Sequence, residues 1–230
     1  MNNRIGIIAG ATGLVGGELL QELLIDPTWS KVYVLVRRPL EWSHPKLETI
    51  LIDWDRFPAL PAGITDAFCC LGTTISQAGS KENFRKVDYE YAVSYAKAAK
   101  NAGADSFHIV TALGSDPHSL IFYNRVKGEA ETEIRKIGFS SLGIFRPSLL
   151  DGDRKEFRLG EKIGQVLAIL INPLLFGPIR KYRSIQGKTV AKAMLNLAWS
   201  GKKGTFLVES DRIQVLGTSS ARSNLDSILR

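Results

Sequence analysis

The stretch Ile5–Gly16, IGIIAGATGLVG, decides the fold of this chain. Its mostly apolar first half predicts a buried strand, and the residues from Leu14 onward have the apolar spacing of a helix. Between them, Gly10 permits a tight turn, Gly13 lets the backbone approach a pyrophosphate, and Gly16 allows the helix to pack closely on the strand. A helix N-terminus at such a turn favours a bound phosphate, whereas an ordinary glycine turn is the alternative. The residues expected to bind a dinucleotide here are Gly10, Thr12, Gly13, Leu14, Val15 and Gly16.

Beyond this turn, short apolar runs alternate with longer amphipathic runs, which is the pattern of βαβ units. We therefore expect an α/β protein in which residues 1–216 form a single domain and residues 217–230 form a loose tail. The segment 149–183 is expected to form the substrate side of the domain. The expected strands are 5–9, 31–36, 47–52, 65–70, 106–111, 141–145 and 205–209, and the expected helices are 14–25, 80–101, 120–137 and 188–199.

The composition limits the possible partners and location. A chain of 230 residues with 44% hydrophobic residues can bury a substantial core, and its net charge of +7 favours anionic ligands such as phosphates. No nucleic-acid-binding motif is present, so no nucleic-acid partner is expected. Cys69 and Cys70 are adjacent, and His44, His108 and His118 lack ligand spacing, so no metal is expected. Because the two cysteines suggest no disulfide framework and no signal peptide is recognisable, the expected location is the reducing cytoplasm.

Arg37 and Arg38 follow the second expected strand, where a NAD-specific site would place Asp or Glu for the ribose hydroxyls. A guanidinium suits the 2′-phosphate of NADP, because its bidentate N–H donors match phosphate geometry. We therefore expect NADP(H) to be preferred over NAD(H), with Arg38 the more dispensable of the two arginines. Asp53, just past the third strand, is a candidate acceptor for the adenine amino group, with a turn or helix cap as the alternative.

Tyr123 and Lys127 lie four residues apart in the helix expected after the fifth strand, so their side chains share one helix face. A nearby ammonium stabilises a tyrosinate. Tyr123 could then exchange a proton with a carbonyl or an alcohol, while Lys127 also holds the cofactor ribose. This spacing is common in amphipathic helices, but its place in a chain with a glycine turn favours a catalytic pair.

Together these motifs resemble the short-chain dehydrogenase/reductase superfamily, specifically the atypical branch that contains the Tat-interacting oxidoreductase and its bacterial relatives. The resemblance implies a doubly wound, mostly parallel Rossmann-type sheet with helices on both faces and a small C-terminal extension on the substrate side. It also implies that Leu71, Gly72 and Thr73 line the cofactor, and that Pro147 and Ser148 lie near the nicotinamide. The matching pieces are Gly10–Gly16, Val36–Arg38, Cys70–Thr74, Val87-Asp88, Thr111–Asp116, Phe122–Ala130 and Phe145–Ser148.

One departure from the family pattern affects the chemistry. Relatives usually have two serines after the fifth strand, one of which polarises the substrate oxygen, whereas this chain has Thr111-Ala112. Thr111 is the expected donor if the first position serves, and Ser115 is the alternative. Loss of a preorganised donor costs about 2.7 to 4 kcal/mol of transition-state stabilisation, so turnover could be slow.

These features predict an NADP(H)-dependent oxidoreductase that transfers a hydride between the nicotinamide and a carbonyl, an alcohol or another small acceptor. The alternative is an NADP(H)-sensing or protein-interaction module with little catalysis. The apolar run 163–179 is short for a bilayer span, and we expect it to line the substrate pocket. Peripheral membrane contact through residues 163–183 is the less favoured alternative. A monomer or a homodimer is expected, with a small-molecule substrate.

Overall fold

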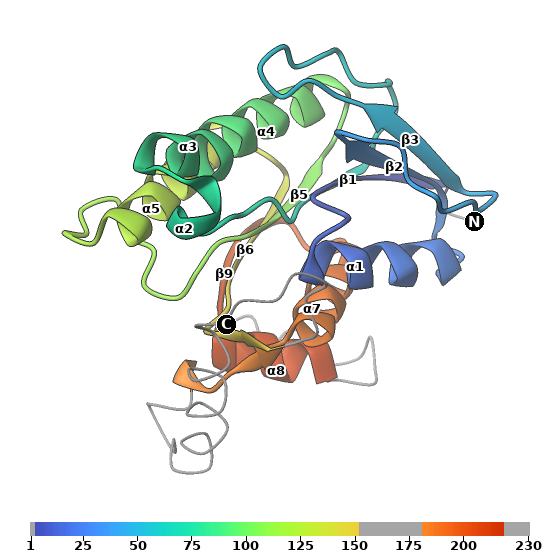
Figure 1. The fold of residues 1–230 in the computed structure, drawn as a ribbon. Helices are drawn as coiled ribbons and strands as arrows, with labels where there is room; N and C mark the ends of the chain where they lie inside the picture. Colours follow the sequence, from blue (N-terminus) through green and yellow to red (C-terminus); the bar gives the residue numbers. More distant parts are fainter. Residues whose placement is uncertain (1–2, 152–180, 219–230) are drawn as a thin grey trace.

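The computed structural model describes residues 3–151 and 181–218. Its centre is a sheet of seven parallel strands in the order β3-β2-β1-β4-β5-β6-β9 (Figure 1). The chain therefore builds outward from β1 in both directions, which is the doubly wound arrangement expected from the family resemblance. The strands are β1 (Arg4–Ala9), β2 (Trp29–Val36), β3 (Leu47–Leu51), β4 (Asp66–Cys69), β5 (Ser106–Val110), β6 (Ser141–Arg146) and β9 (Gly204–Glu209).

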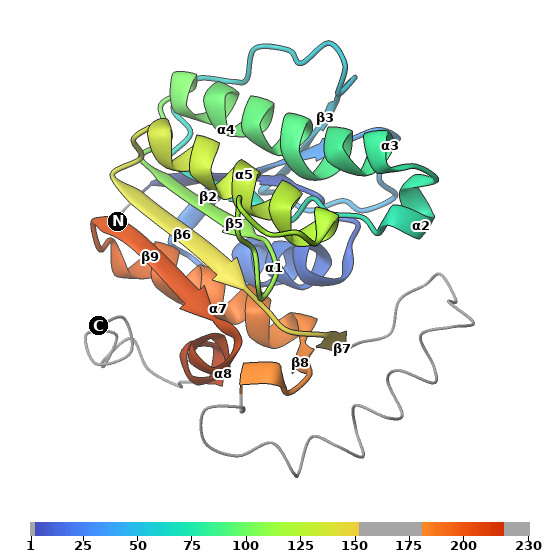
Figure 2. The ribbon, with the colours of Figure 1, turned by 90° about the vertical axis from the view of Figure 1, so that its left-hand side faces the viewer.

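Helices cover both faces of this sheet, as Figures 1 and 2 show. One layer contains α1 (Leu14–Ile25), α7 (Gly187–Ser200) and α8 (Ser210–Thr218). The other contains α2 (Ile75–Ala78), α3 (Lys81–Arg85), the π-helical turn η1 (Lys86–Tyr91), α4 (Ala92–Asn101) and α5 (Phe122–Lys136). A separate pair of short parallel strands, β7 (Leu150–Asp151) and β8 (Ile185–Gln186), follows the end of β6.

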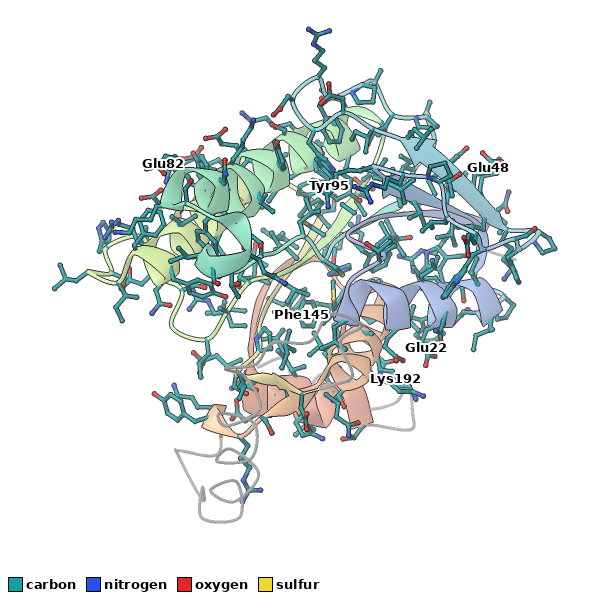
Figure 3. The ribbon with its side chains drawn as sticks, viewed as in Figure 1. Glu22, Glu48, Glu82, Tyr95, Phe145 and Lys192 are labelled. Carbon is teal, nitrogen blue, oxygen red and sulfur yellow. The ribbon has the colours of Figure 1, made fainter. Side chains whose placement is uncertain are left out.

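Each face of the sheet has its own hydrophobic core. Phe145 belongs to the core beneath α1 and α7, and Tyr95 belongs to the core beneath α4; Figure 3 labels both. The buried Tyr95 hydroxyl donates a hydrogen bond to the carbonyl oxygen of Ile7 at 2.9 Å, so its one polar group is satisfied. Glu22 of α1 and Lys192 of α7, also labelled in Figure 3, add an ion pair of 3.9 Å on the outer surface.

A buried polar cluster closes the amino ends of the strands, on the side opposite to the glycine turn. Asp66 is completely buried and forms an ion pair with Arg4, whose Nε donates to Oδ2 at 2.7 Å. Trp29 Nε1 and the Thr65 hydroxyl donate to the same oxygen at 3.1 and 2.7 Å. The buried carboxylate of Asp66 therefore has a counter-charge and hydrogen-bond donors on both oxygens.

The predicted strands and helices are confirmed, but the structure also contains elements that were not predicted, including the short strands β7 and β8. The helix expected over 80–101 contains the π-helical turn η1, and the short helix α2 precedes it. Helix α8 was not predicted, and Gly217, placed in a loose tail by the sequence, lies buried in its last turn. Residues 219–230 of that tail and residues 152–180, including the apolar run 163–179, lie outside the described residues. Within the described parts, no helix is both long and apolar enough to cross a bilayer.

Two glycines of the turn are required by packing. Gly10 has φ +86°, which side chains rarely adopt, and a Cβ there would lie 2.5 Å from the carbonyl oxygen of Cys70. At Gly16, a Cβ would overlap the carbonyl group of Gly10. The first turn of α1 therefore packs directly against the backbone that follows β1.

We expect Gly16→Ala to lower the free energy of unfolding by about 3 kcal/mol or more, because neither backbone segment can move away from the new methyl group. The neighbouring Gly17→Ala is the control. A Cβ there would lie 3.5 Å from the Ala11 carbonyl oxygen, an ordinary contact inside a helix, so stability should stay equal or rise. Chemical denaturation of both variants measures the difference, and equal effects would contradict this account of the turn.

Candidate functional site

The segments named by the sequence motifs converge at one edge of the sheet. In the register of the parallel strands, Ala9 pairs with Leu35 and with Cys69, and Val110 pairs with Phe145. The loops that follow β1, β2, β4, β5 and β6 therefore leave the sheet at the same edge. Figure 2 shows this edge at the arrowheads of β6 and β9, beside β7. Ligands of open α/β sheets bind outside the carboxyl ends of the strands.

The glycine turn leaves the start of α1 open. Thr12 and Gly13 are exposed, and the Gly13 N–H donates to the Gly10 carbonyl oxygen at 3.0 Å to close the turn. Within the described parts of the chain no side chain caps this helix, and its first turn contains no acidic residue. The N–H groups and the positive dipole end of α1 are thus available to an anion. Leu14 is half-buried, and Val15 is buried in the core.

Arg37 and Arg38 follow the end of β2, the strand that pairs with β1. Both are exposed, and the described residues offer neither of them a hydrogen bond or an ion pair. Asp53 is also exposed, and its Oδ1 accepts the Asp55 N–H at 3.0 Å. The turn-forming role considered for Asp53 is therefore present, and its second carboxylate oxygen is still open to another donor.

Tyr123 and Lys127 lie on one face of α5, and this face is packed against α3 and η1. The Tyr123 ring lies against the ring of Phe84, with centroids 5.2 Å apart. Lys127 Nζ lies 2.6 Å from Asp88 Oδ1, and both side chains are almost completely buried. Tyr123 itself is half-buried, and no described residue forms a hydrogen bond with its hydroxyl.

The Lys127 ammonium lies beside the loop that follows β4. A Cβ on the exposed Gly72 would be 3.5 Å from Lys127 Nζ, and the Thr73 N–H donates to Asp88 Oδ2 at 3.0 Å. Burial alone would lower the pKa of Lys127, but the charge of Asp88 raises this pKa above its ordinary value. Lys127 therefore carries its charge throughout the neutral range. Leu71 is half-buried at the start of the same loop.

Thr111 is part of a network that holds the strand ends to α5. Its buried hydroxyl donates to Glu131 Oε1 at 2.6 Å. Arg146 binds the same carboxylate through two nitrogens, at 3.0 Å to Oε1 and 2.5 Å to Oε2. A hydroxyl has one hydrogen to donate, and Thr111 uses it inside the protein. The role of substrate donor predicted for Thr111 therefore does not fit this arrangement, which gives Thr111 a structural role instead.

The other residues expected near the substrate are also bound internally. The Ser115 hydroxyl donates to the Ala112 carbonyl oxygen at 2.7 Å, which closes the turn after β5. The carbonyl oxygen of Pro147 accepts the Leu113 N–H at 2.9 Å, so Pro147 lies next to this turn. The Ser148 hydroxyl is hydrogen-bonded to the Arg183 carbonyl oxygen and lies 2.9 Å from the Ser210 hydroxyl oxygen. Its contacts are thus with the chain just before β8 and with the start of α8, on the expected substrate side.

Two buried acids at this site were given no role by the sequence interpretation, Asp88 and Glu131. The signal that could have found them is a carboxylate inside an apolar helix stripe. Asp88 interrupts the buried series Phe84, Ala92, Tyr95 and Ala99, and Glu131 lies between the buried Lys127 and Ile134. A buried acid needs a partner, so each of these positions predicts a nearby cation or hydrogen-bond donor.

The fold and this strand-edge site define a Rossmann-type protein of the short-chain dehydrogenase/reductase class. The sequence comparison identifies the family. "Protein FMP52, mitochondrial" of Eremothecium gossypii is 34% identical, covering 90% of this chain and 94% of the relative. "Protein HTATIP2" of Rattus norvegicus is 33% identical over 96% of this chain and 92% of its own length. The chain belongs to the family of the FMP52 and HTATIP2 proteins, an atypical branch of this superfamily.

Solved structures show the same fold at low sequence identity. MoeE5 in complex with UDP-glucuronic acid and NAD superposes with a TM-score of 0.68 at 17% identity, over 89% of this chain and 75% of MoeE5. The human epimerase family protein SDR39U1 with NADPH gives a TM-score of 0.61 at 18% identity, over 93% of this chain and 79% of that one. A scan against family models found no match.

The predicted cytoplasmic location is wrong by this comparison. The FMP52 relatives from Eremothecium gossypii, Candida albicans, Debaryomyces hansenii and Aspergillus terreus are all named mitochondrial. The prediction rested on the lack of a recognisable export signal and on two unpaired cysteines. Neither feature separates the cytoplasm from other reducing compartments, which explains the error.

Proposed function

We propose that this protein binds NADP(H) at the strand edge and acts as an oxidoreductase on a small carbonyl, alcohol or related acceptor. The observation that carries the proposal is the N-terminus of α1, where the turn at Gly13 is exposed. Among the described residues no side-chain cap is present there, and the first helical turn contains no acidic residue. An anion is the natural partner of such a helix end. A pyrophosphate would fit here because Gly13 presents backbone without a Cβ.

The preference for NADP(H) over NAD(H) is supported by Arg37 and Arg38. Both follow β2, the strand next to the glycine turn, and both are exposed without a partner among the described residues. A 2′-phosphate would give one of these guanidinium groups a bidentate partner. We assign this role to Arg37, the residue nearer to the strand, while Arg38 contributes general positive charge.

The proposed chemistry divides between cofactor and protein. The nicotinamide, when bound, supplies or accepts the hydride. Tyr123 donates or removes the proton at the substrate oxygen, because its hydroxyl has no internal partner among the described residues. Lys127 holds the cofactor ribose and places a buried positive charge one helical turn away. Leu71 and Gly72 line the cofactor from the loop after β4.

One observation favours the second candidate, an NADP(H)-sensing module with little catalysis. The hydroxyls of both Thr111 and Ser115 donate inside the protein, so neither is free to polarise a substrate oxygen. A missing donor of this kind lowers turnover by about a hundredfold or more. In this case the protein would bind NADPH tightly and turn over slowly.

A steady-state reductase screen separates the two functions. The purified protein is given NADPH with aldehydes, quinones or flavins, and NADPH oxidation is followed against a matched reaction without protein. We expect saturable turnover with at least one of these classes. Tight NADPH binding without turnover on any class would support the sensing module instead.

A further inference from the structure

Residues 81–91, here called the α3–η1 segment, contact both Tyr123 and Lys127, and the contacting residues have the same four-residue spacing as this pair. Phe84 packs on the Tyr123 ring, and Asp88, four residues later, forms the ion pair with Lys127. Residues four apart share a helix face, so one face of the α3–η1 segment meets one face of α5. The π-helical turn that carries Asp88 is a rare conformation, which in helices often marks functional positions.

Asp88 uses its two carboxylate oxygens for two different elements. Oδ1 faces Lys127 Nζ at 2.6 Å, and Oδ2 accepts the N–H of Thr73 at 3.0 Å. Thr73 belongs to the loop after β4, and Gly72 in that loop is exposed directly beside the ion pair. A single carboxylate thus connects the lysine of α5 to the loop expected to line the cofactor.

The charge of Asp88 also compensates a buried ammonium. The Lys127 and Asp88 side chains are 6% and 0% exposed, so neither charge is solvated by bulk water. Without a counter-charge, burial would lower the pKa of Lys127. The other titratable groups whose charges act on Lys127 are Tyr123 and Cys69. Burial raises the pKa of the Cys69 thiol to about 12, so this group stays neutral.

We propose that Asp88 is a positioning residue of the dinucleotide site, which fixes the Lys127 ammonium and the Leu71–Thr73 loop in one arrangement through its two carboxylate oxygens. This inference rests on the proposed function, in which Lys127 holds the cofactor ribose. An ammonium has three N–H donors, and Lys127 Nζ lies within 3.5 Å of the position a Cβ would take on the exposed Gly72, so a ligand on that side could accept from it. Asp88 acts through Lys127 and does not touch the substrate.

The first test is the pH dependence of unfolding without cofactor, for Asp88→Asn and the control Asp66→Asn. Both changes remove a buried carboxylate from an ion pair, and each should raise the unfolding equilibrium constant on the order of a hundredfold at neutral pH. Arg4, the partner of Asp66, cannot lose its proton. The stability lost in Asp66→Asn should therefore not vary with pH above neutrality. Lys127 can lose its proton, so the stability lost in Asp88→Asn should become smaller as pH rises.

The sign of this effect follows from the pKa of Lys127. In the parent protein this pKa is raised, so the pair stabilises the fold below the ordinary lysine pKa and loses this effect at higher pH. In Asp88→Asn the raising effect of the Asp88 charge is removed, and burial then lowers the pKa of Lys127, so Lys127 loses its proton on folding at a lower pH than in the parent. As pH rises, the parent loses the stabilisation by the ion pair and the variant no longer has to neutralise Lys127 on folding. Both effects reduce the difference in unfolding free energy between parent and variant.

The second test is NADPH affinity as a function of pH, measured by fluorescence titration. We expect Asp88→Asn to weaken NADPH binding roughly tenfold at neutral pH, and further as Lys127 loses its proton at higher pH. Asp66→Asn should bind like the parent. In a Lys127→Met background, Asp88→Asn should no longer change the pH dependence, because Asp88 acts through Lys127.

The outcomes separate this inference from the proposed function. A stability loss for Asp88→Asn that is constant with pH, as for Asp66→Asn, would overturn the role of Asp88. An NADPH affinity of Asp88→Asn equal to that of the parent at every pH would also overturn it. If the parent protein itself fails to bind NADPH, the proposed function fails, while the unfolding comparison still decides whether Asp88 maintains the charge of Lys127.

Discussion

Arg37→Glu is expected to reverse the cofactor preference of this protein, from NADPH to NADH. The change removes a charge-assisted, bidentate donor and places a carboxylate opposite the 2′-phosphate. Hydrogen bonds to charged groups contribute about 1.5–3 kcal/mol, which corresponds to roughly a tenfold to hundredfold loss of NADPH affinity before repulsion is added. The new carboxylate can accept hydrogen bonds from the ribose hydroxyls of NADH. Dissociation constants for both coenzymes measure the reversal.

Arg38→Glu is the matched control for this prediction. It makes the same charge change on the next residue, which is equally exposed after β2. If Arg37 binds the phosphate directly, Arg38→Glu should weaken NADPH binding only severalfold, through a general and salt-sensitive change of charge. Equal losses for the two variants, both abolished by salt, would show that neither arginine contacts the phosphate.

Tyr123→Phe is expected to lower kcat by about a hundredfold to ten-thousandfold on any substrate found in the reductase screen, because it removes the proposed general acid. The phenyl ring that packs against Phe84 is retained, so stability should change little. Affinity for NADPH should also stay close to that of the parent, since the proposal gives cofactor binding to other residues.

Tyr91→Phe is the control for loss of a tyrosine hydroxyl elsewhere on the same helical layer. Its hydroxyl donates to Asp55 Oδ1 at 2.9 Å near the surface, away from the Tyr/Lys pair. This variant should keep kcat within severalfold of the parent. If Tyr123→Phe keeps full turnover as well, the proton comes from another group and the assignment of Tyr123 is wrong.

The fold could be predicted because its signals are local. The strand, the glycine turn and the helix over residues 5–25 follow from apolar spacing and from three glycines, two of which the backbone contacts require. The alternation of apolar runs then gives the remaining parallel strands. Helix α8 was missed because it is short. Its few buried residues do not form a helical pattern long enough to be recognised in the sequence.

The partners within the site could not be predicted in the same way, because they come from distant parts of the chain. Asp88 lies 39 positions from Lys127 in sequence, and only the packing of the α3–η1 segment against α5 brings them together. Thr111 illustrates the same point. Its hydroxyl suggested a donor to the substrate, but the fold places Glu131 within 2.6 Å and the hydrogen is used there. Sequence gives the residue types, whereas the fold decides which groups stay free.

The central claim is that a pyridine dinucleotide binds at the glycine turn through the open end of α1. Titration calorimetry with NADPH and with NADH tests it most directly, for the parent and for Gly13→Val. A Cβ at position 13 would lie 3.3 Å from the Gly10 carbonyl oxygen, and the backbone there is extended, so the variant should fold. We predict saturable binding of NADPH, weaker binding of NADH, and loss of both in Gly13→Val. Absence of binding of either coenzyme to the folded parent protein would contradict the account.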